Sequence, residues 1–307
     1  MRILTEGYLN SEKSFAATIG FFDGVHKGHQ YLISKLQALA KSMGMESMVI
    51  SFREHPRLVV QPEAEVLLLT TNEQKCEIIE QLGIDVTVLL NFTREMMNMT
   101  AFEFMKYLHD SLHVKVLLIG YDHRFGHNRS EGFEDYVRYG KEIGIQVVRA
   151  QEERLSKEQG VSSSVVRQFI QEGNMVEAAH CLGHFYGFTG KVIPGYHNGQ
   201  KLGFPTANLQ PDIPNRLLPP VGVYVVWATL DGHAYKGMLN IGYRPTISFD
   251  GHLTLEVHLL NFQGEIYGEF VKIDFVHRLR DEVKFSSPQQ LVEQLERDVQ
   301  SVDIYLR

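Results

Sequence analysis

The chain has 307 residues, 44% hydrophobic and 22% charged, which is ordinary for a globular protein large enough to hold two domains. A formal net charge of −7 argues against nucleic-acid binding, and two cysteines indicate a reducing compartment rather than a disulfide framework. The sequence shows neither a secretory signal nor the roughly 18 apolar residues of a membrane span, so we expect a cytoplasmic protein without a membrane partner.

Strand-like and helix-like segments alternate over the first part of the chain. Apolar runs predict strands at residues 15–20, 48–52, 86–90, 114–119 and 145–149. Helical spacing predicts helices at residues 31–40, 71–82, from 100 onward and 131–143. This alternation predicts a doubly wound, Rossmann-like parallel sheet, whose ligands bind at the carboxyl ends of the strands. Gly20, Phe52, Asn91 and Gly120 fall at such ends.

After Gly183 the pattern changes to short alternating runs, rich in Gly, Pro, Val and Tyr, separated by turns. Residues 223–229 and 253–260 are the clearest strands, and Asp231-Gly232 and Asp250-Gly251 are hairpin signals. A closed antiparallel barrel fits this pattern best. A final helix is expected at residues 287–304, with a buried face formed by Val292, Leu295, Val299 and Val302. We therefore expect two domains, residues 1–183 and 184–307.

The link between the first strand and the first helix reads GFFDGVHKGH, residues 20–29. Asp23-Gly24 turns the chain, and His26 and His29 share one face of the first helical turn. Free N–H groups and the helix dipole favour an anion there by about 0.3–1 kcal/mol per charge. Two imidazoles beside these donors could hold nucleotide phosphates as charge develops. Gly28 lets the backbone approach closely, so the segment predicts a site of phosphate chemistry.

A surface or metal-binding histidine pair is the alternative interpretation of this segment. A zinc site needs a third or fourth ligand, and neither Cys76 nor Cys181 has neighbours that would supply one. The sequence has neither a GxxxxGK[ST] loop nor a GxGxxG fingerprint, so the common alternative phosphate cradles are absent from it.

Two further polar segments follow in the first domain. Residues 120–129, GYDHRFGHNR, concentrate charged and imidazole side chains at a predicted ligand-binding edge, although a solvated loop would look similar. Residues 161–167, VSSSVVR, open a helix with three hydroxyls, for which a simple N-cap is the alternative. Arg167 lies three residues beyond Ser164, so both can face one phosphate.

The second domain has its own polar segments. Five glycines within residues 187–203 give backbone room for a polyphosphate, and Thr206 and Asn208 point to the same side of an extended segment. Their neutral oxygens suit a Mg²⁺ ion that carries nucleotide phosphates. Glu256 and His258 share one strand face, where a carboxylate is usually only solvated. Glu256 becomes a candidate general base if Thr206 and Asn208 converge on it.

These motifs carry a family resemblance over about residues 15–300. An HxGH motif after a first strand resembles the signature of the nucleotidyltransferase superfamily, whose members catalyse attack on the α-phosphate of ATP or CTP. The longer GxFDGxHxGH form resembles the bacterial bifunctional riboflavin kinase/FAD synthetase family. Its motifs GxDFxFGxxRxG, SSTxIR and GxVxxGxxxGxxxGxPTAN resemble residues 120–131, 162–167 and 190–208. The chain departs from the family pattern at Phe21, Glu54, His123, Ser164 and Asn261.

The resemblance implies a bifunctional transferase of flavin cofactor synthesis. Its barrel would phosphorylate riboflavin with MgATP to FMN, and its first domain would join FMN to the α-phosphate of a second ATP, giving FAD and pyrophosphate. The implied catalytic residues are His26, His29, Arg167 and Glu256. The implied ATP- and phosphate-binding residues are Gly20, Phe22, Asp23, Gly24, Gly28, Ser162, Ser163, Ser164, Gly190, Gly195, Gly203 and Pro205. The implied flavin-binding residues are Asp122, Phe125, Arg129, Arg278 and Arg280, and the implied Mg²⁺ ligands are Thr206 and Asn208.

Two alternatives to this function stay open at the level of sequence. One alternative is a one-activity enzyme that has lost adenylyl transfer, as the departures from the family pattern at Phe21, Glu54 and His123 would allow. A barrel that binds flavin without catalysis would instead be a sensor, although the PTAN and ExH elements argue against it.

Overall fold

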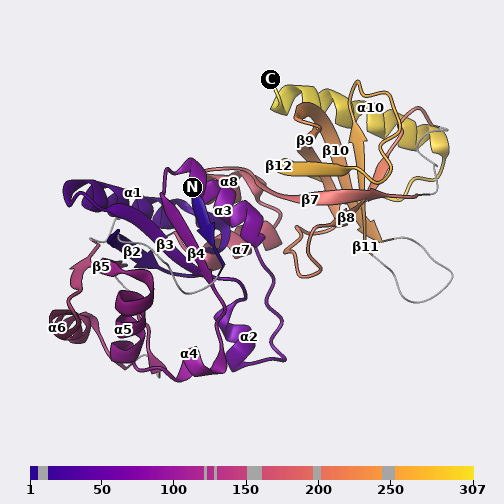
Figure 1. Cartoon of the computed structure of the whole chain (residues 1–307). Coiled ribbons are helices and arrows are strands. Elements are labelled where there is room, and N and C mark those ends of the chain that lie inside the picture. Colours follow the sequence, from indigo (N-terminus) through magenta and orange to yellow (C-terminus); the bar gives the residue numbers. More distant parts are fainter. Residues whose placement is uncertain (6–12, 121–122, 128–129, 151–160, 196–201, 244–252) are drawn as a thin grey trace. The chain divides into compact units, whose positions relative to one another are not determined.

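The computed structural model describes residues 1–5, 13–120, 123–127, 130–150, 161–195, 202–243 and 253–307 (Figure 1). The chain divides into two compact units, residues 1–161 and 162–307. Asp122, Arg129 and the expected Asp250-Gly251 turn lie outside the described residues. In the part of the chain that is described, no helix is both long and apolar enough to cross a membrane.

The first unit is built on a six-stranded sheet in which all neighbouring strands run parallel, in the order β1-β4-β3-β2-β5-β6. The strands are β1 Arg2–Leu4, β2 Phe15–Ile19, β3 Glu46–Phe52, β4 Val86–Leu90, β5 Val114–Ile119 and β6 Gln146–Arg149. The predicted doubly wound sheet is confirmed. The sequence did not reveal β1, because this short edge strand is largely exposed and carries no apolar run.

The strand order reverses at β2, since the chain continues to β3 and β4 on one side and returns to β5 and β6 on the other. Ligands of open parallel sheets bind outside the strand ends at such a switch point. The GFFDGVHKGH segment leaves the carboxyl end of β2 and therefore lies at this position.

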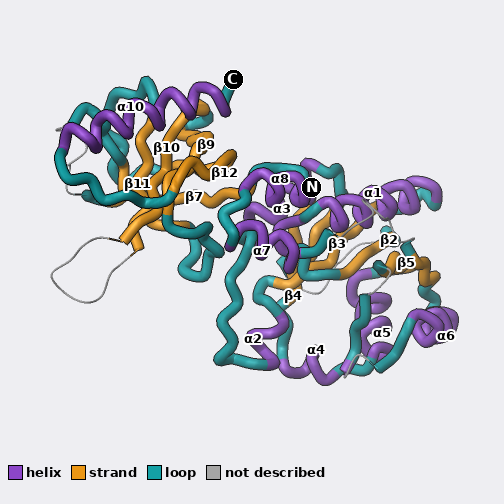
Figure 2. Tube along the Cα trace, turned by 180° about the vertical axis from the view of Figure 1, so that it is seen from behind, coloured by secondary structure: helices purple, strands orange, loops and turns teal. Residues whose placement is uncertain are grey.

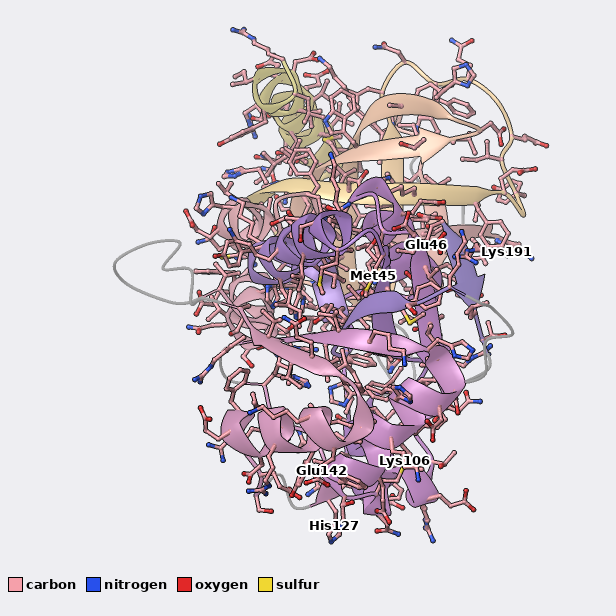
Figure 3. All side chains as sticks on the ribbon, turned by 60° about the vertical axis from the view of Figure 1, so that its left-hand side comes forward. Met45, Glu46, Lys106, His127, Glu142 and Lys191 are labelled. Carbon is pink, nitrogen blue, oxygen red and sulfur yellow. The ribbon has the colours of Figure 1, made fainter. Side chains whose placement is uncertain are left out.

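Helices cover both faces of this sheet (Figure 1). Helices α1 Lys27–Ser42 and α3 Asn72–Gln81 pack on one face, and α5 Ala101–Leu112 and α6 Phe133–Ile143 pack on the other. The short helices α2 Pro56–Val60 and α4 Arg94–Asn98 have no buried residue. Alternate strand residues pack into two cores, Val49 with Ile79 of α3 and Ile50 with Leu108 of α5. Lys106 and Glu142 are exposed on α5 and α6 (Figure 3).

The second unit begins with α7 Ser163–Gln171 and α8 Met175–Leu182 and continues into a closed antiparallel barrel (Figure 2). Its strands are β7 Tyr186–Ile193, β8 Ala207–Pro211, β9 Gly222–Leu230, β10 His233–Tyr243, β11 Leu253–Leu259 and β12 Phe270–Arg280, in the order β10-β11-β8-β7-β12-β9. The barrel prediction is confirmed. So is the Asp231-Gly232 hairpin, where both residues have positive φ, 48° and 77°.

The terminal helix α10, Pro288–Tyr305, lies against the outside of the barrel. Val302 packs with Val225 of β9 and Met238 of β10, whereas Tyr224 and Phe275 fill the barrel interior. Helix α8 packs on β7 and β12 and belongs to the second compact unit, which begins at residue 162. The functional boundary predicted at residue 183 stays a prediction.

Candidate active sites

The turn after β2 is backbone-strained and firmly held. Phe22, Gly24 and Val25 have φ of 56°, 76° and 39°, a region that costs a non-glycine residue about 1–3 kcal/mol. The Asp23 carboxylate accepts hydrogen bonds from the backbone N–H groups of Leu69 and Thr70, at 3.0 and 3.1 Å. Asp23 is 4% exposed. Asp23 thus holds the turn through these two backbone groups, while its predicted part in ATP binding stays a prediction.

The two glycines of this segment have clear steric functions. A Cβ at Gly20 would lie 3.1 Å from the Phe22 ring, and one at Gly28 would lie 3.2 Å from the His26 ring and 3.3 Å from the Val161 carbonyl oxygen. The Phe22 side chain is itself buried in the core. In this turn, therefore, backbone N–H groups, and not the Phe22 side chain, are available to contact a phosphate.

His26 is the N-cap of α1. Its Nδ1 accepts a hydrogen bond from the backbone N–H of His29 at 3.3 Å. An imidazole nitrogen that accepts carries no proton, so in the neutral ring the proton resides on Nε2. The cap thus fixes His26 in the tautomer whose Nε2 can donate to an anion at the helix start.

His29 stacks on His26, with ring centroids 3.6 Å apart, and meets the Phe22 ring edge-on at 5.0 Å. Burial, with smaller contributions from the nearby His26, His123 and Lys75, lowers the pKa of His29 well below its usual 6.5. His29 is therefore neutral at pH 7. Its buried Nδ1 has no hydrogen-bond partner among the described residues, and a buried orphan of this kind suits a ligand contact.

The segment after β5 contributes two side chains with different positions. His123 is close enough to His29 to lower its pKa, so the structure brings these two predicted segments together. Phe125 instead stacks on Tyr136 at 4.2 Å and is buried in the core. The Tyr136 ring covers one face of Phe125, and the flavin contact predicted for Phe125 stays a prediction. The predicted Asp122 and Arg129 lie outside the described residues.

Ser162 is the N-cap of α7, and its Oγ accepts from the Val165 N–H at 3.3 Å. This is the structural alternative that the sequence left open for the serine run. Ser163 and Ser164 occupy the first two helical positions, and Arg167 follows one turn later. Their backbone N–H groups and the helix dipole form an arrangement that favours anions.

The predicted kinase residues converge in the barrel. Glu256 of β11 pairs directly with Asn208 of β8, and directly opposed residues of an antiparallel pair share one face. Thr206 Oγ1 donates to Glu256 Oε2 in a long hydrogen bond of 3.4 Å. On the other side Glu256 pairs with Asn240 of β10, which sequence reasoning did not single out as a site residue. The condition for Glu256 as a candidate base is met.

His258 fixes the loop that carries Thr206. Its Nδ1 lies 2.7 Å from the Pro205 carbonyl oxygen, which can only accept, so Nδ1 bears the proton. The same ring meets Phe204 edge-on at 5.5 Å. His258 thus anchors the FPTAN segment to the strand of Glu256.

The glycines of residues 190–203 differ in function. A Cβ at Gly195 would lie 2.1 Å from Asn208 Nδ2, so Asn208 requires a glycine there. Gly203 has a φ of 83° and forms an open, exposed turn. Gly190 faces the barrel core, where a Cβ would lie 3.0 Å from the Phe188 ring, and both neighbouring strands pair with it. Packing alone therefore favours a glycine at position 190, and its predicted phosphate contact stays a prediction.

Arg278 and Arg280 are held by protein partners. Arg278 Nη2 donates to the Val221 carbonyl at 2.8 Å and to Asp281 at 2.7 Å. Arg280 forms an ion pair with the buried Asp298 of α10, with Nη2 and Oδ2 2.7 Å apart. The Arg280 guanidinium thus ties the terminal helix to β12, while the flavin contact predicted for Arg278 and Arg280 stays a prediction.

Lys75 of α3 lies beside the histidine turn, and sequence reasoning did not single it out. It is 2% exposed, and its Nζ donates to two backbone carbonyls. One belongs to Phe21, just after β2, and the other to Phe52, the last residue of β3. The only available signal was its position four residues before the buried Ile79, on the helix face toward the core.

Fold and sites together define a two-domain transferase, with a histidine turn at the switch point of a parallel sheet and a Thr–Asn–Glu cluster on a barrel. Residues 9–165 match the FAD synthetase family and residues 182–306 the riboflavin kinase family. The chain therefore belongs to the bifunctional riboflavin kinase/FMN adenylyltransferase family.

Relatives cover nearly the full length. The chain is 34% identical over 299 residues to the bifunctional riboflavin kinase/FMN adenylyltransferase of Listeria monocytogenes, covering 97% of this chain and 94% of that one. It is 33% identical over 302 residues to the enzyme of that description from Bacillus subtilis, covering 94% and 91%. A crystal structure described as a macrolide-efflux protein from Streptococcus pneumoniae superposes with a TM-score of 0.88 and 28% identity, covering 99% of both chains.

Proposed function

We propose that this chain phosphorylates riboflavin to FMN in its barrel domain and adenylylates FMN to FAD in its first domain. One observation carries the proposal: each of the two matched family regions has its own cluster of the polar groups that its reaction requires. These are the stacked His26 and His29 after β2, and Glu256 with Thr206 and Asn208 on the barrel.

In the kinase reaction Glu256 is the general base. Its carboxylate accepts the proton of the flavin 5′-hydroxyl as that oxygen attacks the γ-phosphorus of ATP, and ADP leaves as the bond between the γ-phosphorus and the bridging oxygen breaks. The Thr206 hydroxyl orients the carboxylate, and the His258 anchor keeps Thr206 in place. The main rate advantage comes from positioning the base, the alcohol and the phosphate in line, because the protein forms no covalent bond in phosphoryl transfer.

Thr206 and Asn208 are suited to hold the Mg²⁺ that accompanies ATP. Both present neutral oxygens of the kind that hard cations prefer, and Gly195 leaves no side chain beside the Asn208 amide. Among the described residues no group of three or more His, Cys, Asp and Glu could hold a metal. When bound, Mg²⁺ neutralises phosphate charge.

In the adenylyl transfer the FMN phosphate is the nucleophile, so the protein needs none. The α1 N-terminus and the His26 Nε2–H donate to phosphate oxygens, and the neutral His29 adds a contact without a full charge. Ser163, Ser164 and Arg167 of α7 are proposed to bind the leaving pyrophosphate, supported by the family motif and the helix start. Flavin or adenosine contacts remain predicted for Asp122 and Arg129. The predicted extent of this functional domain remains residues 1–183.

Two variants test the assignment, each serving as the control for the other. The protein is incubated with Mg²⁺ and ATP plus either riboflavin or FMN, and the flavins are separated by chromatography. We expect Glu256→Gln to lose FMN formation yet convert supplied FMN to FAD. We expect His26→Ala to form FMN without FAD.

Specific outcomes would contradict the proposal. Unchanged FMN formation by Glu256→Gln would remove Glu256 as the base. A wild-type protein that forms FMN but no FAD would be a one-activity kinase, and one that binds riboflavin without converting it would be a sensor.

A further inference from the structure

The loop before α3 and the first turns of α3 contact the histidine turn at three points. Asp23 accepts from the backbone of Leu69 and Thr70, and the Gly24 N–H donates to Thr70 Oγ1 at 3.1 Å. Lys75 Nζ donates to the Phe21 carbonyl at 3.3 Å and to the Phe52 carbonyl at 3.1 Å. One segment of α3 thereby ties the turn to the ends of two neighbouring strands.

The Phe21 carbonyl is the critical contact. It belongs to the peptide that enters the left-handed Phe22, and it accepts from Ser51 Oγ at 2.9 Å as well as from Lys75. Strained backbone persists only where the surroundings over-determine it. Two donors on this carbonyl fix the direction in which the chain leaves β2, and therefore where His26 begins α1.

Lys75 is unusual among lysines because its ammonium is buried. It lies 4.6 Å from the centroid of the Phe21 ring, a cation–π distance. Burial lowers its pKa from 10.5 to about 8, although Asp23 of the turn and Cys76 and Glu73 of α3 favour the charged form. Lysines are seldom buried so fully, which favours a functional reason for this one.

The charge of Lys75 also acts on His29. It is one of the neighbours that lower the pKa of His29, so it helps to keep that imidazole neutral. A buried cation beside a site of phosphate chemistry stabilises developing negative charge more strongly than it would in water.

We propose that Lys75 is a positioning residue for adenylyl transfer, which holds the histidine turn through the Phe21 and Phe52 carbonyls and adds a buried positive charge to the site. This inference rests on the proposed adenylyltransferase function of the first domain. The neutral amine still has two N–H donors for these carbonyls, but only the ammonium form carries the charge, so the free enzyme loses this electrostatic support as Lys75 deprotonates.

The variant Lys75→Met, in the full chain, removes the charge and both donors while keeping an unbranched side chain. Lys41→Met, at an exposed position of α1, is the matched control. We expect Lys75→Met to lower kcat for FMN adenylylation about 10²-fold, the order of loss from a small misplacement of catalytic groups. Riboflavin phosphorylation on the same sample reports folding of the barrel and stays within about twofold of wild type.

A pH profile separates a charged positioning residue from a merely structural one. In the wild type, kcat/KM for adenylylation is expected to fall as pH rises through about 8, the pKa of Lys75, while kcat/KM for phosphorylation shows no such step. Lys75→Arg, whose charge persists, shifts the fall to higher pH.

The outcomes are distinguishable. Adenylylation by Lys75→Met within about threefold of wild type overturns the inference and leaves the proposed function intact. If the variant does not fold, the wild-type profile decides, and a flat adenylylation profile between pH 7 and 9 overturns it. A wild type that forms no FAD at any pH refutes the proposed function and this inference with it.

Discussion

The Arg280–Asp298 pair allows a quantitative prediction about the barrel. Asp298 accepts from Arg280 Nε at 3.0 Å and Nη2 at 2.7 Å, and from Gln294 Nε2 at 2.8 Å. The two charged side chains are 18% and 5% exposed. Asp298→Asn keeps the shape of the side chain but leaves the guanidinium without its counter-charge.

The expected loss follows from this burial. Removing one partner of a fully buried ion pair costs about 3–5 kcal/mol, and the partial exposure of Arg280 places this case near the lower end, at about 3 kcal/mol. A urea m-value of about 2 kcal/mol/M is typical of a unit of this size, so the midpoint should fall by about 1.5 M.

The single tryptophan makes the measurement specific to the barrel. Trp227 lies in β9 and packs against the cluster of Val299 and Val302 of α10, so its fluorescence in urea reports this unit. A loss below about 1 kcal/mol would refute the reasoning, because the pair would then be as weak as an exposed one. Replacing both partners by apolar residues, Arg280→Met with Asp298→Leu, should recover most of the loss.

Three further predictions concern the sites. Gly195→Ala places a Cβ 2.1 Å from Asn208 Nδ2 and should lower FMN formation about 10²-fold, with adenylylation of supplied FMN unchanged in chromatographic assays. His26→Asn retains an N-cap and should leave stability within about 1 kcal/mol in urea while FAD formation falls about 10²-fold. The pKa of Lys75 is about 8 in the folded protein and 10.5 in an ordinary lysine. Between these pH values the unfolded state therefore binds more protons than the folded state. Stability of the first unit should therefore rise with pH across this window by up to about 3 kcal/mol, and in Lys75→Met should not, as measured by pulse proteolysis in urea.

Each of these has a contradicting result. Normal FMN formation by Gly195→Ala would mean that the Asn208 amide is not needed where it lies. Full FAD formation by His26→Asn would reduce His26 to a helix cap. Equal pH dependence of stability in wild type and Lys75→Met would show that the lysine titrates as it does in water.

Much of this protein is determined by its sequence alone. Apolar periodicity, caps such as Thr100 and turn residues such as Asp231-Gly232 act within a few residues of chain, so both folds and their order were predictable. The motif around His26 and His29 was predictable for the same reason, because strand, turn and helix follow one another directly.

Tertiary structure alone decided which polar side chains meet. Glu256 became a candidate base only when strand pairing placed it beside Asn208, and Arg280 became a helix anchor only when α10 brought Asp298 to it. Lys75 lies in a helix of polar composition and looks solvated in the sequence, yet packing buries its ammonium against two strand ends. The physical reason is that burial and charge pairing depend on groups distant in the chain, whose approach no local pattern encodes.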